Sequence, residues 1–441
     1  MNRQDDIAKA EAIMRNNDRG NYTVPTHGLY PFQWNWDSCL SALGFSHFDL
    51  DRGLVELETL FASQWQDGMV PHIIFHEYDD GYFPNADVWQ TNQLVPTSGI
   101  TQPPVAGYAL AELYKRANDK EAIEGRTRQL LQQVHKWHQW FYRYRADQSG
   151  LVAIVHPWES GRDNSVDWDA AFERVPTEGV SPFVRRDTSH ANPKHRPTDE
   201  QYKRYIWLVQ KFRSLGWDNA EIARQSPFQI VDPGFNAILI RSSLALAELA
   251  DTLGEAQVAA ESRVFADKAQ TSLEGLWSDA FGQYLCYDRV TKTLVQSPSV
   301  SGVLAVFAPI PRQRVEQIAQ TIRKLAEQSN YLVASHPPSA PEFDELRYWR
   351  GPVWLIVNYM IAVGLRDAGQ TDLVQRIVDD SIALIEKSGF AEYYGPIRAT
   401  PCGGDAFTWT AAMVLEFFST FDPRVETESL IELNNVHQGM S

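Results

Sequence analysis

The sequence is poor in cysteine and has no long apolar run. Its three cysteines, Cys39, Cys286 and Cys402, are odd in number and far apart, so they predict neither a disulfide framework nor a paired-cysteine metal site. No apolar run approaches the roughly 20 residues that cross a membrane, and the polar, acidic first residues do not resemble a secretory signal. We therefore expect a cytoplasmic protein with no membrane partner.

The motifs that bind nucleotides and catalytic zinc are also missing. The sequence contains no P-loop and no GxGxxG turn. His72, His76 and Glu77 lie close together, but Pro71 and Gly81 indicate a loop here, and the HExxH order is absent. The net charge of −16 argues against nucleic acid, which needs a basic face. The sequence thus predicts no metal, no cofactor and no nucleic-acid partner.

Helical periodicity dominates the 441 residues. Helices are predicted at 39–48, 53–64, 104–116, 123–144, 200–212, 235–252, 257–277, 312–328, 353–367, 371–388 and 410–418. Strands are predicted only at 152–155 and 284–288, and the residues before about 30 are interpreted as polar and then loop-like. Paired helices joined by long loops predict an all-α protein, an (α/α)6 barrel with its loops at one end. An open α-solenoid is the alternative, against which the irregular loop lengths count.

The length suits one large domain, and we expect a single catalytic domain over residues 1–441. Residues 176–219 are polar, charged and contain prolines, so they are interpreted as a lid inserted into this domain. Asp37 or Ser38 is expected to cap the helix that follows, because both residue types favour that position. Such a barrel is stable alone, and a monomer or small homo-oligomer is expected.

The sequence has fourteen tryptophans, and several of them lie in loops that also carry acids. The densest of these loops is Trp158-Glu159-Ser160-Gly161-Arg162-Asp163-Asn164-Ser165-Val166-Asp167-Trp168-Asp169. A sugar has an apolar face and a rim of hydroxyls, and Trp beside a carboxylate offers a surface for both. A carboxyl pressed against Trp also loses water, which raises its pKa and keeps it protonated near neutrality. This loop therefore predicts the general acid of a glycoside hydrolase.

The choice among the acids of this loop stays open on these grounds: Glu159 and Asp167 are the alternatives to Asp163. An inverting hydrolase also needs a second carboxylate, roughly 6.5–9.5 Å from the acid, to activate water on the other face of the sugar. If the aromatic–acid loops meet at one end of the barrel, two of their carboxyl groups can face each other across a cleft.

Four motifs carry a resemblance to a known family. They are Trp36-Asp37-Ser38, Glu159-Ser160-Gly161-x-Asp163-Asn164-Ser165, Tyr348-Trp349-Arg350-Gly351-Pro352-x-Trp354 and Glu392-Tyr393-Tyr394. In this order they resemble the motifs of glycoside hydrolase family 63, over about residues 32–418. The resemblance implies an (α/α)6 barrel that inverts the configuration of an α-linked glucose or mannose. It also implies that Asp163 is the general acid, Glu392 the general base and Asp37 a ligand of sugar hydroxyls.

The lid resembles one branch of that family, which hydrolyses glucosylglycerate and mannosylglycerate. The similar segment runs from Arg185-Arg186-Asp187-Thr188 to Arg196-Pro197-Thr198-Asp199-Glu200-Gln201-Tyr202. The resemblance implies that Arg196, Tyr202 and Tyr348 hold the glycerate carboxylate, as a guanidinium fork and phenol donors can. Asp405 departs from the branch, where a neutral polar group is expected near the aglycone. If Asp405 faced that subsite, it would repel glycerate and favour a neutral aglycone.

The aromatic–acid loops mark a wider substrate-binding set. Its members are Trp36, Asp37, Trp65, Gln66, Trp158, Asn164, Arg196, Tyr202, Tyr348, Arg350, Gly351, Trp354 and Trp409. Four of these tryptophans, at 36, 65, 354 and 409, are equally compatible with core packing, and Arg350 with a structural ion pair.

The predicted partner is thus a small-molecule glycoside, with glycerate or a neutral group as aglycone. Two other classes remain. A sugar epimerase uses the same toroid, but with His acid–base pairs, and few His lie in the matched motifs. A non-catalytic sugar-binding protein would not need both candidate carboxyl groups.

Overall fold

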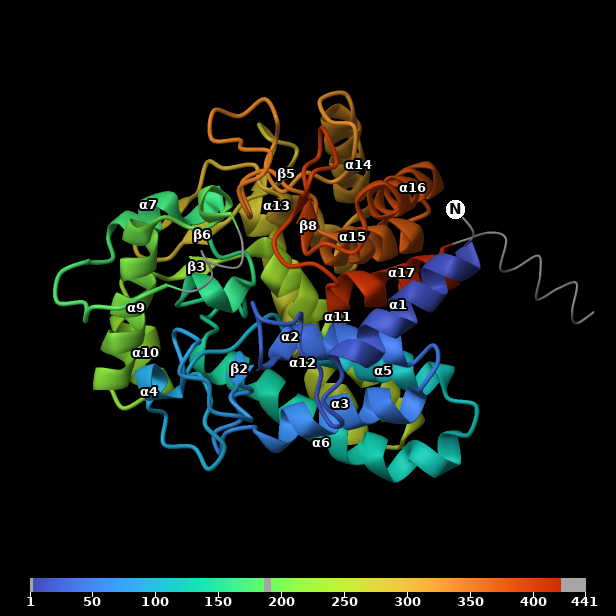
Figure 1. Cartoon of the computed structure of the whole chain (residues 1–441), viewed down its shortest axis with the longest axis horizontal. Helices are drawn as coiled ribbons and strands as arrows, with labels where there is room; N and C mark the ends of the chain where they lie inside the picture. The colour runs from blue at the N-terminus through green and yellow to red at the C-terminus, as the bar shows by residue number, and fades with distance from the viewer. Residues whose placement is uncertain (1–2, 186–191, 422–441) are drawn as a thin grey trace, which may run out of the picture.

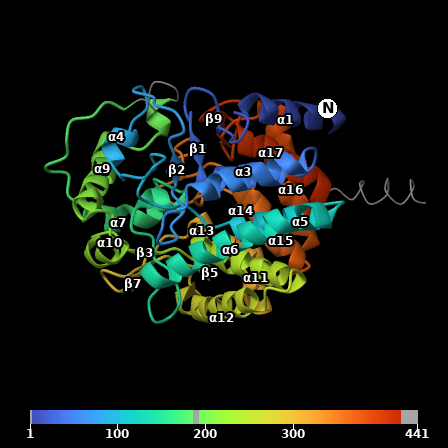
Figure 2. The same cartoon turned by 90° about the horizontal axis from the view of Figure 1, so that it is seen from below.

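A closed ring of helices forms the inner layer of the molecule, and these helices lie in the middle and on the right of Figures 1 and 2. The ring consists of α2 (Asn35–Phe45), α5 (Ala106–Arg116), α11 (Pro233–Thr252), α13 (Val300–Leu304), α15 (Leu355–Asp367) and α17 (Thr408–Thr420). Each of these helices contacts the next in this order, and α17 contacts α2. All residues of α2 are buried, as expected of a helix that is covered on every side. The computed structural model describes residues 3–185 and 192–421.

A second layer of helices covers this ring. It contains α1 (Arg3–Asn17), α3 (Leu50–Ala62), α6 (Lys120–Tyr144), α12 (Ala256–Leu273), α14 (Arg312–Ala326) and α16 (Thr371–Ser388). Helix α1 contacts α17, α3 contacts α2, α6 contacts α5 and α12 contacts α11. Helix α14 contacts the strand β5 (Gln283–Tyr284), and α16 contacts α15. The outer helices are amphipathic: α14 buries Val315, Ile318, Ala319, Ile322 and Leu325 on one face. The two layers form the predicted (α/α)6 barrel, and the all-α prediction is confirmed.

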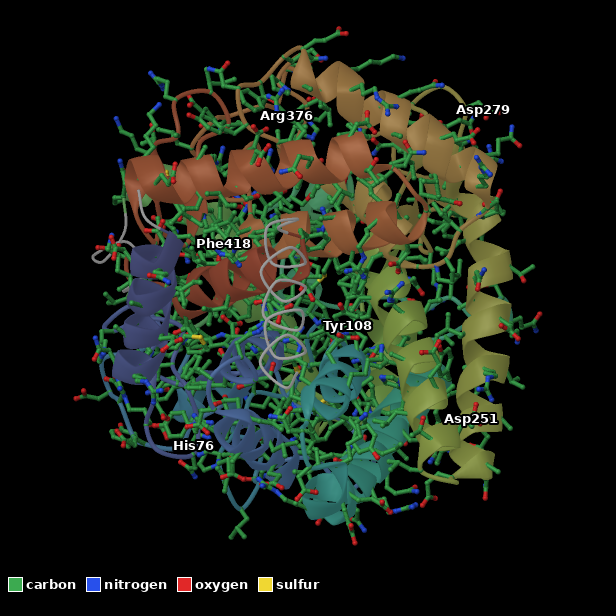
Figure 3. All side chains as sticks on the ribbon, turned by 90° about the vertical axis from the view of Figure 1, so that its right-hand side faces the viewer. His76, Tyr108, Asp251, Asp279, Arg376 and Phe418 are labelled. Carbon is green, nitrogen blue, oxygen red and sulfur yellow. The ribbon has the colours of Figure 1, made fainter. Side chains whose placement is uncertain are left out.

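Side chains fill the space between the helices. Figure 3 places Tyr108 of α5 near the middle of the ring, with Asp251 and Arg376 at the periphery. The hydroxyl groups of Tyr108 and Tyr359 of α15 lie 2.9 Å apart and link two ring helices that are not neighbours. None of the described helices is long and apolar enough to cross a membrane.

The sequence does not predict helix α1: the residues before about 30 are interpreted as polar and then loop-like, whereas residues 3–17 form a helix. The helix buries only Asp6, Ala10, Met14 and Asn17, and two of these are polar. Its apolar stripe is therefore too weak to show in the sequence. Polar contacts with α17 supplement it: Nδ2 of Asn17 donates to the Ala406 carbonyl and to Oγ1 of Thr408, both at 2.9 Å.

The start of α2 also differs from the prediction. Trp34 is the N-cap residue and makes no side-chain cap, so the expectation that Asp37 or Ser38 caps this helix is wrong. The reason lies in the strands: β1 (Gln33–Trp34) pairs with β2 (Ile73–Ile74), and the Asn35 amide donates to the His72 carbonyl at 3.1 Å. This pairing starts the helix early and places Asp37 in its first turn.

The strands are two residues long and fasten the loops. Besides β1 and β2, they are β3 (Ile230–Val231), β4 (Trp277–Ser278), β5 (Gln283–Tyr284), β6 (Tyr287–Asp288), β7 (Thr293–Leu294), β8 (Tyr393–Tyr394) and β9 (Pro401–Cys402). The predicted strand at 284–288 is β5 and β6, and Val152 and Ile154 form only isolated bridges. Strand β8 pairs with β9 so that Tyr393 faces Cys402, which folds the chain back just beyond Glu392.

The remaining helices lie together on one side of the barrel, the left in Figure 1. They are α4 (Ala86–Trp89), α7 (Asp169–Glu173), α9 (Asp199–Ser214) and α10 (Asn219–Gln225). Helix α9 is the helix predicted at 200–212, and Thr198 and Gln201 form a capping box at its start. Residues 186–191 of the expected lid, including Arg186, Asp187 and Thr188, lie outside the described residues.

Candidate active site

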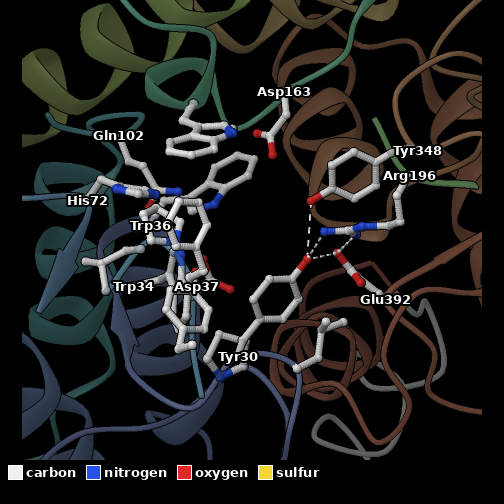
Figure 4. Close-up of a pocket in the computed structure, with 18 of the residues that line it drawn as sticks. Tyr30, Trp34, Trp36, Asp37, His72, Gln102, Asp163, Arg196, Tyr348 and Glu392 are labelled. Atoms are coloured by element: carbon white, nitrogen blue, oxygen red, sulfur yellow. Dashed lines mark hydrogen bonds and ion pairs between the residues drawn. The ribbon is translucent and has the colours of Figure 1, made fainter. Parts of the chain in front are cut away.

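A cavity of about 170 Å³ lies where loops from distant parts of the sequence meet. Its walls come from segments 25–37, 72–84, 158–163 and 196–202, together with Gln102, Tyr348, Glu392, Phe407 and Trp409. Nine of the residues proposed from the sequence line it: Trp36, Asp37, Trp158, Asp163, Arg196, Tyr202, Tyr348, Glu392 and Trp409. The cavity has room for a small organic molecule rather than only a few waters. Figure 4 shows Asp163 and Glu392 entering it from different walls.

The carboxyl group of Glu392 is buried and held by several donors. Tyr30 OH donates to Oε1 at 3.1 Å, and the Gly404 amide donates to Oε2 at 3.0 Å. Nη1 of Arg196 lies 3.8 Å from Oε1. Burial raises the pKa of Glu392, while Arg196 and the hydrogen bonds lower it in part. The side chain is therefore held in place, and Arg196 and the hydrogen bonds offset part of the effect that burial has on its pKa.

Asp163 is positioned through its backbone. Its carbonyl accepts hydrogen bonds from Nε1 of Trp168 at 3.1 Å and from Tyr205 OH at 2.8 Å. The preceding Gly161 has a φ of +68°, and a Cβ there would lie 2.5 Å from the Trp36 ring, so this turn requires glycine. The side chain of Asp163 is partly exposed and points into the cavity (Figure 4).

The other acids of this loop have structural partners and do not line the cavity. Glu159 accepts hydrogen bonds from Nη2 of Arg145 at 3.2 Å and from the Val155 amide at 2.8 Å. Oδ2 of Asp167 accepts from Arg162 at 3.0 Å, and Asp169 pairs with Arg350. The geometry therefore favours Asp163 over the two alternatives that the sequence left open.

Asp37 lies in the first turn of α2 and is buried in the cavity wall. Burial raises its pKa well above the usual range, and the negative charge of Glu392 raises it further. Glu392 and Asp37 thus lie in different electrostatic settings: the cation Arg196 lies beside Glu392, whereas the charges that act on Asp37 are negative.

A guanidinium and phenols form the wall next to Glu392. Nη2 of Arg196 donates to the Tyr30 hydroxyl at 2.9 Å, and its Cζ lies 4.2 Å from the centre of the Tyr348 ring. Burial raises the pKa of both Tyr30 and Tyr348 well above the usual range, so both phenols stay neutral and can donate. Tyr202 OH donates to the Phe83 carbonyl at 3.2 Å.

Tyr30 was missed by the sequence analysis because no predicted motif or helix contains it. The same holds for Gln102 and Phe83, whereas His72 was considered only as a metal ligand; all line the cavity. No group of three or more His, Cys, Asp or Glu suited to a metal occurs within residues 3–185 and 192–421. Nδ1 of His72 instead lies 3.1 Å from the Ser98 hydroxyl.

Six residues of the predicted binding set do not line the cavity. Nε1 of Trp65 donates to Oγ1 of Thr97 at 3.1 Å within the core, and Gln66 is exposed to solvent elsewhere. Trp354 stacks on Trp349 with ring centres 3.9 Å apart.

The other three support the loops behind the wall. Arg350 pairs with Asp169. A Cβ on Gly351 would lie 2.3 Å from the Asp344 carbonyl, so this residue allows two backbones to approach closely. Oδ1 of Asn164 accepts a hydrogen bond from the Trp349 amide at 2.9 Å. These positions give the three residues supporting rather than lining roles.

Asp405, the departure noted in the sequence, is exposed and does not line the cavity. Its Oδ1 accepts a hydrogen bond from the Ala406 amide at 2.8 Å. Asp405 therefore does not face the aglycone subsite, where it would repel an anionic aglycone.

Comparison with known proteins adds independent information. Residues 30–410 match the model of the mannosylglycerate hydrolase MGH1-like glycoside hydrolase domain. The mannosylglycerate hydrolase of Thermus thermophilus is 44% identical over 412 residues, which cover 92% of this chain and 99% of the relative. The glucosylglycerate hydrolase of Mycolicibacterium hassiacum is 29% identical over 443 residues, covering 93% and 97%.

The structural comparison agrees. The crystal structure of a GH63 mannosylglycerate hydrolase from Thermus thermophilus, in complex with Tris and D-glycerate, has a TM-score of 0.91 to this chain at 43% identity. The match covers 94% of this chain and 100% of the other.

Proposed function

Because the chain belongs to the mannosylglycerate hydrolase branch of glycoside hydrolase family 63, we propose that it hydrolyses mannosylglycerate and glucosylglycerate to free sugar and glycerate. Mannosylglycerate is placed first because the mannosylglycerate hydrolase relative is 44% identical and the glucosylglycerate hydrolase relative 29%. The observation that carries the substrate class is Arg196, which lies in the cavity with Tyr348 and Tyr30 and beside Glu392. A guanidinium with phenol donors suits a small aglycone that bears a carboxylate.

Asp163 is the proposed general acid and Glu392 the proposed general base. Asp163 protonates the glycosidic oxygen as the bond to the anomeric carbon breaks. Glu392 removes a proton from the water that attacks that carbon from the opposite face. The sugar then leaves as the β-anomer.

The assignment of the two roles is supported by the surroundings of each carboxyl group. A base must be ionised before the reaction, and Glu392 receives hydrogen bonds from Tyr30 OH and the Gly404 amide, with Arg196 nearby. These contacts favour the anion. Asp163 enters from a different wall (Figure 4), as an acid acting on the leaving group must.

The sugar lies against the aromatic wall in this proposal. Trp36, Trp158 and Trp409 offer flat apolar surfaces for the sugar ring. Asp37 forms hydrogen bonds with the sugar hydroxyls. Because Asp37 is buried, water does not compete for these bonds. Arg196, Tyr202 and Tyr348 take the glycerate carboxylate. The expected lid on the single catalytic domain supplies Arg196, Pro197 and Tyr202 of its described residues to the cavity wall, and a lid there would exclude water other than the nucleophile.

The test is hydrolysis of a substrate panel by the purified protein. The panel contains mannosylglycerate, glucosylglycerate, the neutral glucosylglycerol and kojibiose. Proton NMR records the anomeric signals of the sugar product early in the reaction. The proposal expects β-anomer from a glycerate glycoside and slow turnover of the neutral compounds. Cleavage of the neutral substrates alone would refute the carboxylate contact. Early α-anomer would refute inversion, and epimerised free sugar or binding without turnover would refute the hydrolytic assignment.

A further inference from the structure

A buried hydrogen bond joins the loop of Asp163 to the loop of Tyr348, in addition to the ion pair between Asp169 and Arg350. Oδ1 of Asn164 accepts from the backbone amide of Trp349 at 2.9 Å. Asn164 directly follows Asp163, and Trp349 directly follows Tyr348. Asn164 is 1% exposed, so this bond is shielded from water. Without it, the buried Trp349 amide would have no acceptor, and the protein would be destabilised by the desolvation of that amide.

The same peptide group is held from its other side. Nε1 of Trp354 donates to the Tyr348 carbonyl at 3.2 Å. The Tyr348 carbonyl and the Trp349 amide belong to one peptide unit, so two side chains fix its orientation. This matters because Tyr348 has a φ of +44°, a left-handed conformation that is strained for a residue with a bulky side chain. The surrounding contacts must stabilise it.

The backbone of the Asp163 loop is also held by two side chains, at the residue just before Asn164. Trp168 and Tyr205 both donate to the Asp163 carbonyl, at 3.1 and 2.8 Å. Asn164 therefore extends from a fixed support. Its Nδ2 has no hydrogen-bond partner among residues 3–185 and 192–421, so the acceptor Oδ1 is the atom that does the tethering.

We propose that Asn164 is a positioning residue that holds Tyr348 in register with Asp163. The inference rests on the proposed function, in which Tyr348 binds the aglycone carboxylate and Asp163 protonates the oxygen next to it. The two contacts are made to the same small aglycone. A fixed spacing between the two loops then places the glycosidic oxygen at the acid when the carboxylate is bound.

The test compares variants that keep or remove the acceptor. Asn164→Leu keeps the branched shape, with a larger volume and no acceptor, and Asn164→Asp retains an acceptor. Asn358→Leu is the control. Oδ1 of Asn358 also accepts a hydrogen bond from a buried backbone amide, that of Val333 at 3.0 Å, but Asn358 does not line the cavity. Each variant is assayed on mannosylglycerate and on α-mannosyl fluoride, which has no glycerate and whose leaving group needs no protonation.

Asn164→Leu is expected to lower kcat/KM on mannosylglycerate by about 100-fold, the effect of a misplacement on the order of 1 Å. Its rate on the fluoride should fall by far less, within about threefold of wild type, because the fluoride needs no proton from Asp163 and has no carboxylate for Tyr348 to bind. A small loss is expected there because Tyr348 also hydrogen-bonds to Glu392. Asn164→Asp should recover most of the loss. Asn358→Leu should lower Tm while leaving both rates unchanged.

Equal losses on both substrates, or an Asp variant as impaired as the Leu variant, would overturn the proposal. If Asn164→Leu does not accumulate as folded protein, Asn164→Ala removes the acceptor with less steric demand and is judged by the same ratio of the two rates. Wild-type protein that cleaves neither glycerate glycoside would refute the proposed function instead. In that case the kcat/KM of Asn164→Leu is compared with that of wild type on whichever α-glycoside the protein cleaves. Equal kcat/KM values for the two proteins would refute the positioning role.

Discussion

A Cβ atom on Gly403 would lie 2.1 Å from Oε2 of Glu392. The next residue, Gly404, donates its amide to the same oxygen at 3.0 Å. The two glycines thus wrap the backbone around the carboxylate, and the carboxylate has room only because residue 403 has no side chain. Gly403 also has a φ of +77°, which independently favours glycine.

Gly403→Ala should lower kcat by about 100-fold, because the methyl group displaces the carboxylate by more than the reaction tolerates. Gly254→Ala is the matched control: its φ is +76° and nothing lies within 4 Å of the added Cβ. Both variants should lose about 1–2 kcal/mol of stability from the left-handed backbone, measured by thermal unfolding. A Gly403→Ala protein with wild-type kcat would show that Glu392 is not the base.

Asp163→Asn and Glu392→Gln should each lower turnover of mannosylglycerate by about 10²–10⁴-fold. The two variants should separate on α-mannosyl fluoride, which needs a base but no acid. Asp163→Asn should hydrolyse the fluoride at close to the wild-type rate, and Glu392→Gln should not. The reverse pattern would exchange the proposed roles. Far-UV circular dichroism checks that both variants are folded.

Asp37→Asn should stabilise the protein increasingly as the pH rises. Burial raises the pKa of Asp37 above its value in the unfolded chain, so its favourable contribution is present below the unfolded pKa, about 4. That contribution is lost as the pH rises through the folded pKa. Asparagine cannot ionise, so the gain in Tm over wild type should be small near pH 4 and larger at pH 8.

Scanning calorimetry at several pH values measures this difference, and Asp251→Asn is the control. Asp251 is exposed, and its hydrogen bond with Arg263 lowers its pKa, so the sign is reversed and no gain at high pH is expected. A Tm difference for Asp37→Asn that does not change with pH would contradict the effect of burial.

Arg196→Gln should move the acidic limb of the pH–rate profile to higher pH. Burial raises the pKa of Glu392, and the positive charge of Arg196 opposes that rise. Without Arg196 the pKa rises further, and the base is then protonated, and inactive, at pH values where the wild-type base is still ionised. The profile is best recorded on α-mannosyl fluoride, whose hydrolysis does not depend on glycerate binding. An acidic limb at the wild-type position would mean that Arg196 does not act on the base.

The helices were predictable where an apolar stripe is strong. Helix α14 repeats Val315, Ile318, Ile322 and Leu325 along one face, and its start was predicted to the residue. Helix α1 buries only two apolar side chains, Ala10 and Met14, a pattern that polar loops also show. The (α/α)6 barrel followed from the number and pairing of the helices, together with the resemblance.

The candidate site was only partly predictable, because sequence does not show which way a side chain points. Trp354 and Trp409 look alike in the sequence, yet Trp354 is stacked in the core and Trp409 lines the cavity. Tyr30 lies in no motif, and its role appears only when folding brings it within 3.1 Å of Glu392. Asp163 was selected by the resemblance, and its two rivals are removed by partners that only the structure reveals.

The contact between α1 and α17 also bears on the order in which the protein folds. Nδ2 of Asn17 donates to Oγ1 of Thr408 across a separation of 391 residues, and contacts of such long range form late because a large loop must close first. Helix α17 also holds the segment of Glu392, through Nε1 of Trp409 to the Glu392 carbonyl at 3.2 Å. We therefore expect a nascent chain to build most of its helices during synthesis and to gain activity only when α17 docks.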